Sequence, residues 1–111
     1  MTDSEGLTRL EYHVLLAMAE GPRYGYAIRD AVEEESARTL TPRAGTLYRV
    51  IARLITSGLV AEIQPPAEAE PHPGRPRRYY ALTERGRTQL SDEAQRMRDA
   101  AALARRRLRN A

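Results

Sequence analysis

Arginine side chains recur between residues 43 and 53, and hydroxyl-bearing residues lie among them. Arg43, Arg49 and Arg53 carry positive charge, and Thr46 and Tyr48 add hydroxyl groups. A guanidinium group donates two parallel hydrogen bonds to a phosphate or to the edge of a guanine, so this set has the chemistry to read a polyanion. Taken alone, a charged helix face is more often only a solvated surface.

A helix over residues 42–57 is predicted to position these side chains. Thr41-Pro42 is typical of an N-cap followed by the first helical residue, where the missing amide proton of proline costs nothing. Ser57-Gly58 indicates the end of this helix. The apolar residues fall on the side away from the arginines, namely Leu47, Ile51, Leu54 and Ile55.

An earlier helix is predicted at about residues 8–20, before a Gly-Pro pair. Thr8 and Glu11 have the spacing of a capping box, in which each side chain bonds to the other residue's backbone. Leu7 and Tyr12 occupy the two positions of a hydrophobic staple. The start of this helix is therefore specified locally.

A second short helix begins near Tyr24 and leads into the acidic run at residues 33–35. Its apolar stripe has helical spacing and predicts one buried face. Gly25 lies near its start, where glycine costs helix stability. This position indicates either close packing against the first helix or simple tolerance of glycine near a helix end.

Two strands with an extended loop between them follow the arginine-bearing helix. Residues 59–64 alternate in polarity, which places Leu59, Ala61 and Ile63 on one predicted face, and residues 78–82 form the second strand. The connection holds five of the seven prolines, and proline cannot donate to a sheet, so it is a loop. This pattern predicts a wing, whose arginines are placed to contact phosphates: Arg75, Arg77 and Arg78.

A long helix is predicted from a cap at Thr83 to about Arg109, or ~40 Å at 1.5 Å per residue. Its apolar and small residues recur with alternating spacings of four and three, the seam of a coiled coil. This seam predicts pairing with a second copy of the chain; a helix folded back on its own body or frayed at residues 105–107 is the alternative. The seam residues are Leu90, Ala94, Met97, Ala101, Ala104 and Leu108.

Charge is distributed unevenly along the chain, although its net value is only +3. Residues 1–37 sum to −5, residues 38–64 to +3 and residues 77–111 to +6. A basic remainder behind an acidic N-terminal region suits a protein that turns one face to a polyanion. Every basic residue is arginine, which favours bidentate contacts but also fits a coding bias toward arginine.

The order of these elements predicts a mainly α fold with a small β-wing, a winged helix-turn-helix followed by a long C-terminal dimerisation helix. Residues 1–82 form the DNA-binding domain and residues 83–111 the dimerisation helix. The major groove of B-DNA admits one α-helix, whose first residues reach base edges. Arg43, Thr46 and Arg49 occupy that leading part, and Tyr48 is placed to touch a thymine methyl or a phosphate. Arg53 is better placed for phosphates.

Several other classes of protein are disfavoured by composition. The chain has no cysteine, and His13 and His72 are isolated, so we expect no metal site and no cofactor. We expect no enzyme activity, since no paired histidines, phosphate-binding glycine loop or buried acid–base pair is evident. No apolar run is long enough to span a membrane, and the acidic N-terminus differs from a signal peptide, so we expect a cytoplasmic protein without membrane contact.

Several segments together resemble the PadR family of phenolic-acid-decarboxylase-type repressors, over roughly residues 7–90. The resemblance implies a homodimeric winged-helix transcription factor, usually a repressor, of the subfamily with a short C-terminal helix. Some members bind flat aromatic drugs between tryptophans at the dimer centre, but this chain has no Trp and no Phe. The matching segments are Leu7-Thr8, Val14-Leu15-Leu16, Gly21 to Tyr26, Gly45 to Arg49, Arg53-Leu54, Gly58-Leu59-Val60 and Arg77 to Thr83.

The sequence thus predicts a dimeric regulator that binds double-stranded DNA at a palindromic operator. Whether a small-molecule effector binds at the dimer centre stays open, because alanines in the seam indicate either a groove or close helix approach. A winged-helix module that binds proteins is the alternative function. Its prolines at Pro71, Pro73 and Pro76 have the spacing of a polyproline ligand.

Overall fold

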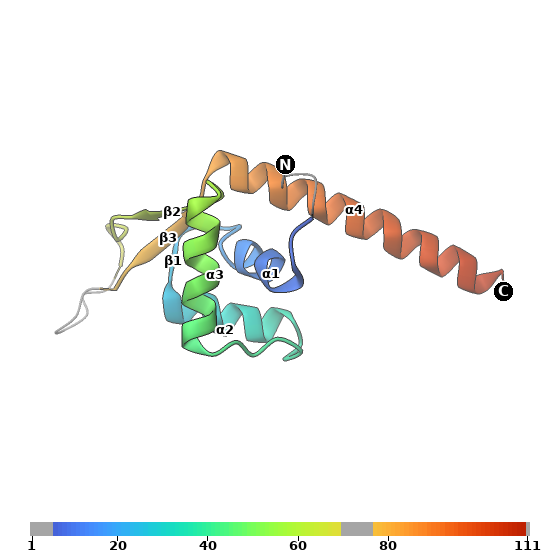
Figure 1. Cartoon of the computed structure of the whole chain (residues 1–111), viewed down its shortest axis with the longest axis horizontal. Coiled ribbons are helices and arrows are strands. Elements are labelled where there is room, and N and C mark those ends of the chain that lie inside the picture. The colour runs from blue at the N-terminus through green and yellow to red at the C-terminus, as the bar shows by residue number, and fades with distance from the viewer. Residues whose placement is uncertain (1–5, 70–76, 111) are drawn as a thin grey trace.

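The computed structural model of the chain describes residues 6–69 and 77–110. Three helices form one body, a small sheet lies at one side of it, and a long helix projects from the other side (Figure 1). This arrangement confirms the predicted winged helix-turn-helix with a long C-terminal helix. The elements are α1 (Arg9–Ala17), β1 (Arg23–Tyr24), α2 (Gly25–Glu35), α3 (Ala44–Thr56), β2 (Val60–Ile63), β3 (Tyr79–Leu82) and α4 (Glu84–Arg109).

The first helix begins as its capping box predicts. The Thr8 hydroxyl accepts a hydrogen bond from the Glu11 amide, and the Glu11 carboxylate accepts one from the Thr8 amide. The helix ends at Ala17, before the predicted end at residue 20, because Met18 leaves the helical conformation. The Met18 side chain is fully buried, so this residue packs in the core although it lies outside the helix.

Strand β1 was not predicted, and it precedes α2 directly. Arg23 pairs with Tyr80 and Tyr24 with Tyr79, so the antiparallel sheet has the order β1-β3-β2. Two residues are too few to show the alternation that marks a strand, and their partners lie far along the chain. Helix α2 starts at Gly25, immediately after this strand, and Tyr24 is its N-cap.

Gly25 does pack closely, but not against the first helix as one prediction held. A methyl group at Gly25 would lie 2.0 Å from the hydroxyl oxygen of Tyr48, which belongs to α3. Only glycine leaves room for this phenol at the first turn of α2. The contact is therefore one of those that join α2 and α3.

Helix α3 starts at Ala44, later than the predicted start at residue 42. Arg43 rather than Thr41 is its N-cap, since Arg43 has extended backbone angles and its carbonyl accepts the first helical bond, from the Leu47 amide at 2.9 Å. Pro42 is buried, so its ring packs in the body rather than opening the helix. The shift leaves Arg43 at the exposed leading end of α3.

The wing hairpin pairs β2 with β3, from Val60 opposite Leu82 to Ile63 opposite Tyr79. The predicted inward face of Leu59, Ala61 and Ile63 is only partly right. Leu59 and Val60 are both buried, and Ala61 and Ile63 are half-buried. Leu59 lies in the bend before the strand, where its amide bonds to the Leu54 carbonyl, so the strand begins one residue later than predicted.

The core lies where α1, α2 and α3 meet the base of the sheet. Each helix buries one apolar stripe, as helical periodicity requires. The largest fully buried side chains are Leu15, Met18, Ile28, Leu47, Ile51, Leu54, Val14, Val32 and Val60.

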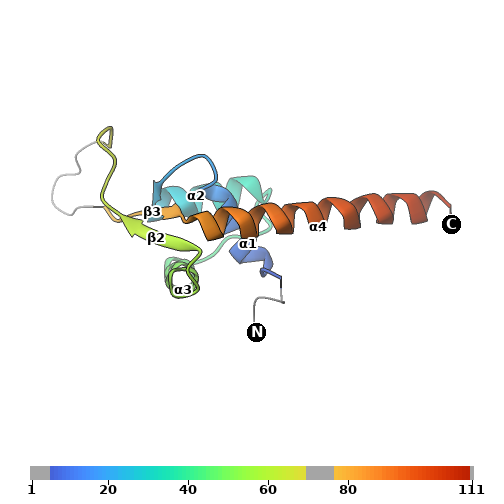
Figure 2. The same ribbon diagram turned by 90° about the horizontal axis from the view of Figure 1, so that it is seen from above.

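Helix α4 starts at its predicted cap, because the Thr83 hydroxyl accepts a hydrogen bond from the Gly86 amide. A methyl group at Gly86 would lie 2.1 Å from the Leu59 carbonyl oxygen, so the helix starts tightly against the body. Its 26 residues extend for ~39 Å and leave the body halfway along (Figures 1 and 2). Within residues 6–69 and 77–110, no helix is long and apolar enough to cross a lipid bilayer.

Candidate nucleic-acid interface

The outward face of α3 carries the side chains predicted to contact DNA. Its inward face is held by Leu47, Val50, Ile51 and Leu54, which are all nearly fully buried. Arg43, Tyr48, Arg49 and Arg53 are exposed on the other side, and Thr46 is half-buried. In both views α3 runs along the edge of the body beside the β2–β3 hairpin (Figures 1 and 2). The fold therefore brings these side chains and the wing to neighbouring parts of the surface.

Arg49 and Thr46 lie together on the first two turns of α3. The Arg49 Nη2 atom is 3.4 Å from the Thr46 hydroxyl oxygen, a long hydrogen bond. This contact leaves the guanidinium group exposed while holding it near the leading end of the helix. Such an arginine can donate two hydrogen bonds to a guanine edge.

Tyr48 is predicted to touch a thymine methyl or a phosphate. In the structure its side chain is also packed against another helix. Its phenol lies against Gly25, at the first turn of α2, and 43% of the residue remains exposed. The ring is thus part of the α2–α3 contact as well as of the surface. Its hydroxyl group lies nearest the start of α2.

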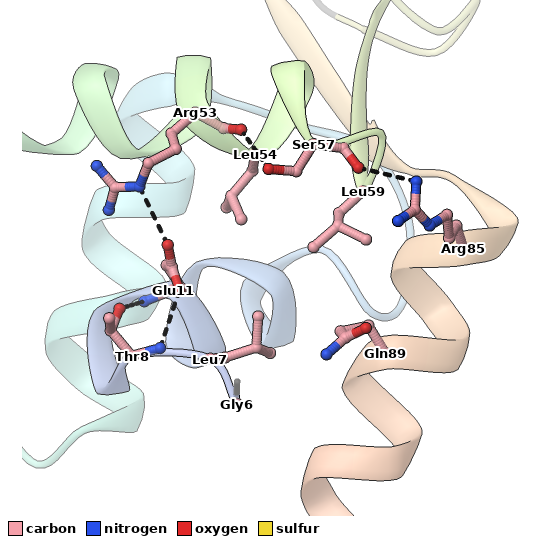
Figure 3. Close-up of a pocket in the computed structure, with 10 residues that line it drawn as sticks. All are labelled: Gly6, Leu7, Thr8, Glu11, Arg53, Leu54, Ser57, Leu59, Arg85 and Gln89. Atoms are coloured by element: carbon pink, nitrogen blue, oxygen red, sulfur yellow. Dashed lines mark hydrogen bonds and ion pairs between the residues drawn. The ribbon is translucent and has the colours of Figure 1, made fainter. Parts of the chain in front are cut away.

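Arg53 is held by an acidic side chain from another helix. Its Nε atom lies 3.1 Å from Glu11 Oε2, and the other oxygen of that carboxylate accepts from the Thr8 amide at 2.9 Å (Figure 3). Glu11 is largely buried, with 15% of its side chain exposed, whereas 55% of the Arg53 side chain is exposed. The capping residue of α1 therefore also ties α1 to α3.

A cavity of about 360 Å³ lies beside this network, between the segment before α1, the end of α3 and the start of α4. Leu7, Leu54 and Leu59 form its apolar part. Arg85 reaches across to donate to the Ser57 carbonyl at 3.2 Å (Figure 3). The cavity thus lies where the helix with the exposed arginines meets the long helix.

The wing arginines have different environments. Arg75 lies outside the described residues. The Arg77 guanidinium carbon lies 4.1 Å from the centre of the Tyr24 ring. Arg78 extends outward, with 74% of its side chain exposed and its Nε atom 3.9 Å from a Glu62 carboxylate oxygen. Of the two described wing arginines, Arg78 is thus the more exposed.

Sequence reasoning missed two small residues at the centre of the exposed α3 face. Gly45 and Ala52 are both exposed and lie at i−4 and i+3 from Arg49, so the three residues share one face. A methyl group at Gly45 would meet only the Arg49 guanidinium, at 3.7 Å, so the protein's own packing does not require glycine there. The helical spacing around Arg49 is the signal that could have identified them.

The predicted dimerisation stripe of α4 divides into two parts. Leu90 and Ala94 are half-buried, and Leu90 packs against the core of its own chain. Beyond them, Met97, Ala101 and Ala104 are exposed. Leu108, near the end of the helix, is 75% exposed. The outer part of the stripe is therefore open to a partner.

Two titratable side chains of the body have shifted pKa values. Burial raises the pKa of Tyr80 above its usual 10.0, and Glu62 and Tyr48 add to this rise while Arg78 opposes it. Burial lowers the pKa of His13 below 6.5, with a further decrease from Arg9 and an opposing effect of Glu35. In the part of the chain that the structure describes, no three His, Cys, Asp or Glu side chains gather as metal ligands do.

Comparison with known proteins identifies relatives of this chain. The model of the transcriptional regulator PadR-like family matches residues 14–92. An uncharacterized 37.1 kDa protein in transposon TN4556 of Streptomyces fradiae is 38% identical over 84 residues, which cover 76% of this chain. The chain spans only about a fifth (21%) of the length of that protein.

Solved structures share the fold. A PadR-like transcription factor from Bacteroides fragilis has a TM-score of 0.69 and 27% identity, with 87% of each chain covered. A PadR family transcription regulator from Clostridium difficile has a TM-score of 0.74 and 23% identity, with 91% of this chain and 99% of that one covered. Bacillus subtilis PadR, solved in complex with operator DNA, has a TM-score of 0.62 and 21% identity, with 78% and 47% covered.

The family match extends from within α1 to within α4, so it includes the exposed face of α3 and the wing. It also covers more than half of the chain. This chain belongs to the transcriptional regulator PadR-like family.

Proposed function

We propose that this PadR-like regulator is a homodimeric repressor that binds a palindromic DNA operator in the cytoplasm. The observation that carries the proposal is the exposed face of α3, where Arg43 and Arg49 stand free of acidic partners in the described ion pairs. The hairpin beside this face supplies a second element for contact with a duplex. The solved complex of Bacillus subtilis PadR with operator DNA supports this use of the fold.

In this proposal, side chains on the first half of α3 contact the bases directly. Arg43, Thr46 and Arg49 enter the major groove, which is wide enough for one helix. Gly45 presents no side chain there, so the helix can approach the base edges closely. Phosphate contacts, which set register without reading sequence, fall to Arg53 and Arg78.

Dimerisation falls to residues 83–111, and residues 1–82 form the DNA-binding domain. The outer stripe of α4 pairs with a second copy, because Met97 and Leu108 otherwise remain exposed on a projecting helix. Two recognition helices then lie one DNA turn apart, about 34 Å, on the two halves of a palindrome.

An effector completes the proposal. We place the effector in the cavity of Figure 3 instead of at the dimer centre. This cavity lies where α3 meets α4, so a small molecule bound there can change the angle between the recognition helix and the dimer. Such a change alters the separation of the two recognition helices and releases the operator. The match with the half-site spacing is lost when that separation shifts.

The test is equilibrium binding to a labelled duplex from the region upstream of the protein's own coding sequence. A scrambled duplex of the same composition is the control. We expect tighter binding to the upstream duplex, with a slope of log affinity against log salt near −5 for about six phosphate contacts. Equal, weak binding to both duplexes at every salt concentration would reject the proposal and favour a module that binds proteins.

A further inference from the structure

Arg77 and Arg78 are consecutive arginines at the base of the wing, yet their side chains have opposite environments. Arg78 is exposed and extends toward Glu62 at the outer side of the hairpin. Arg77 is half-buried, with its guanidinium carbon 4.1 Å from the centre of the Tyr24 ring. At this distance a guanidinium group over an aromatic face is a cation–π contact.

The Tyr24 ring is held by the wing in a second way. Tyr24 of β1 pairs with Tyr79 of β3, and their ring centres are 5.6 Å apart at an angle of 63°. Edge-to-face packing of this kind is favourable for aromatic pairs. Tyr79 is the first residue of β3, and Arg77 lies in the segment just before it. Two side chains of the wing therefore contact the Tyr24 ring.

Tyr24 in turn connects directly to the two helices of the helix-turn-helix. It is the N-cap of α2, and the next residue, Gly25, supports the Tyr48 phenol of α3. A continuous series of contacts therefore runs from Arg77 through Tyr24 and Gly25 to the recognition helix. The order of elements in Figure 1 agrees, because β1 lies between the wing strand β3 and the start of α2.

We propose that Arg77 is a positioning residue that sets the orientation of the wing relative to α3 through Tyr24. In this proposal Arg77 positions the wing, in place of the phosphate contact predicted from the sequence. A planar guanidinium group suits this role, because it stacks on a ring face while lysine offers only a compact charge. The inference rests on the proposed DNA binding, since wing orientation matters only when α3 and the wing meet the same duplex.

The test compares salt dependence among four variants on the upstream duplex. Arg77→Gln and Tyr24→Leu should each weaken binding roughly three- to tenfold, as loss of one cation–π contact does, while the salt slope stays at the wild-type value. Tyr24→Phe keeps the ring and should bind like the wild type. Arg78→Gln is the matched control, and its salt slope should become shallower by about two units because the homodimer loses one phosphate contact on each half-site.

The double variant Arg77→Gln with Tyr24→Leu separates a shared role from two independent ones. If both residues act through one stack, the double variant should bind no more weakly than the weaker single variant. Thermal unfolding of every variant checks that the body stays folded at the binding temperature.

Two results would overturn the inference. The first is a salt slope for Arg77→Gln that falls as it does for Arg78→Gln, together with wild-type binding by Arg77→Lys, because both indicate a phosphate contact. The second is fully additive losses in the double variant. Failure of the proposed function is a different result, in which the wild type itself does not distinguish the upstream duplex from the scrambled one.

Discussion

On the leading turns of α3, Arg49 is exposed and keeps only a long contact with the Thr46 hydroxyl, at 3.4 Å. We expect Arg49→Ala to reduce the preference for the operator over scrambled DNA by about 1–3 kcal/mol for each half-site, since one bidentate base contact is lost there. Binding isotherms on both duplexes measure this preference. Arg109→Ala, at the far end of α4, is the matched control for net charge and should keep the preference.

The opposite pattern would assign Arg49 a different role. Equal weakening on all duplexes, with a shallower salt slope, would make Arg49 a phosphate contact.

His13 is a second side chain whose chemistry can be measured. Its Nδ1 atom is buried and has no hydrogen-bond partner among the described residues, and burial lowers the pKa of the imidazole below 6.5. The unfolded chain therefore binds the proton more readily. The stability that neutral His13 provides is complete above pH 6.5 and is lost as the pH falls from 6.5 through the lowered pKa of the folded state.

We therefore expect the melting temperature to drop between about pH 7.5 and about pH 5.5, and to drop less in His13→Gln. Thermal unfolding of the two proteins at both pH values measures the difference. His72 is present in both proteins and cancels in the comparison. An equal drop in the two proteins would contradict the role of His13.

At the scale of elements, α2 and α3 make one especially close contact, at Gly25 and Tyr48. A methyl group at Gly25 would lie 2.0 Å from the Tyr48 hydroxyl oxygen and 2.7 Å from the ring carbon that bears it. We expect Gly25→Ala to destabilise the wild-type protein by about 1–3 kcal/mol, as overpacking does. In a Tyr48→Ala background the same change should be neutral or slightly stabilising, since alanine favours helix over glycine.

Chemical unfolding of the four proteins in this cycle measures the coupling between the two positions. A similar loss of stability in both backgrounds would show that Gly25 is required for another reason. Because Tyr48 also lies on the exposed face of α3, the cycle separates its packing role from any role in binding DNA.

At the scale of the whole molecule, we propose that α4 determines how two copies meet. Met97 is 46% exposed in the outer stripe, where we propose that a partner helix covers it. Met97→Glu should convert the dimer to a monomer, because two charges in an apolar seam cost roughly 2 kcal/mol or more. Sedimentation equilibrium measures the change.

Ala102→Glu is the matched control for this prediction. Ala102 is exposed and lies away from the stripe on the same helix, so the dimer should persist. A dimer that is unchanged by Met97→Glu would remove α4 as the pairing surface. Operator binding should weaken along with dimerisation, since each half-site holds only one recognition helix.

The sequence by itself determined features that depend only on residues close together in the chain, such as the caps of α1 and α4. The caps at Thr8 and Thr83 were predicted and are confirmed, because a cap needs only a side chain and an amide three residues away. The end of α4 at Arg109 and the order of the main elements follow from helical periodicity and from proline placement. The fold was predicted from these same local signals.

Only the tertiary structure decided which groups meet across long stretches of chain. The two-residue strand β1 exists because β3, over 50 residues later, supplies its hydrogen bonds. Likewise, Arg53 meets Glu11, Arg77 meets Tyr24, and Tyr48 fills the space at Gly25. A basic residue in a sequence shows its charge but not its partner, because the partner is set by packing of the whole body. That packing decides which predicted arginines remain open to a duplex.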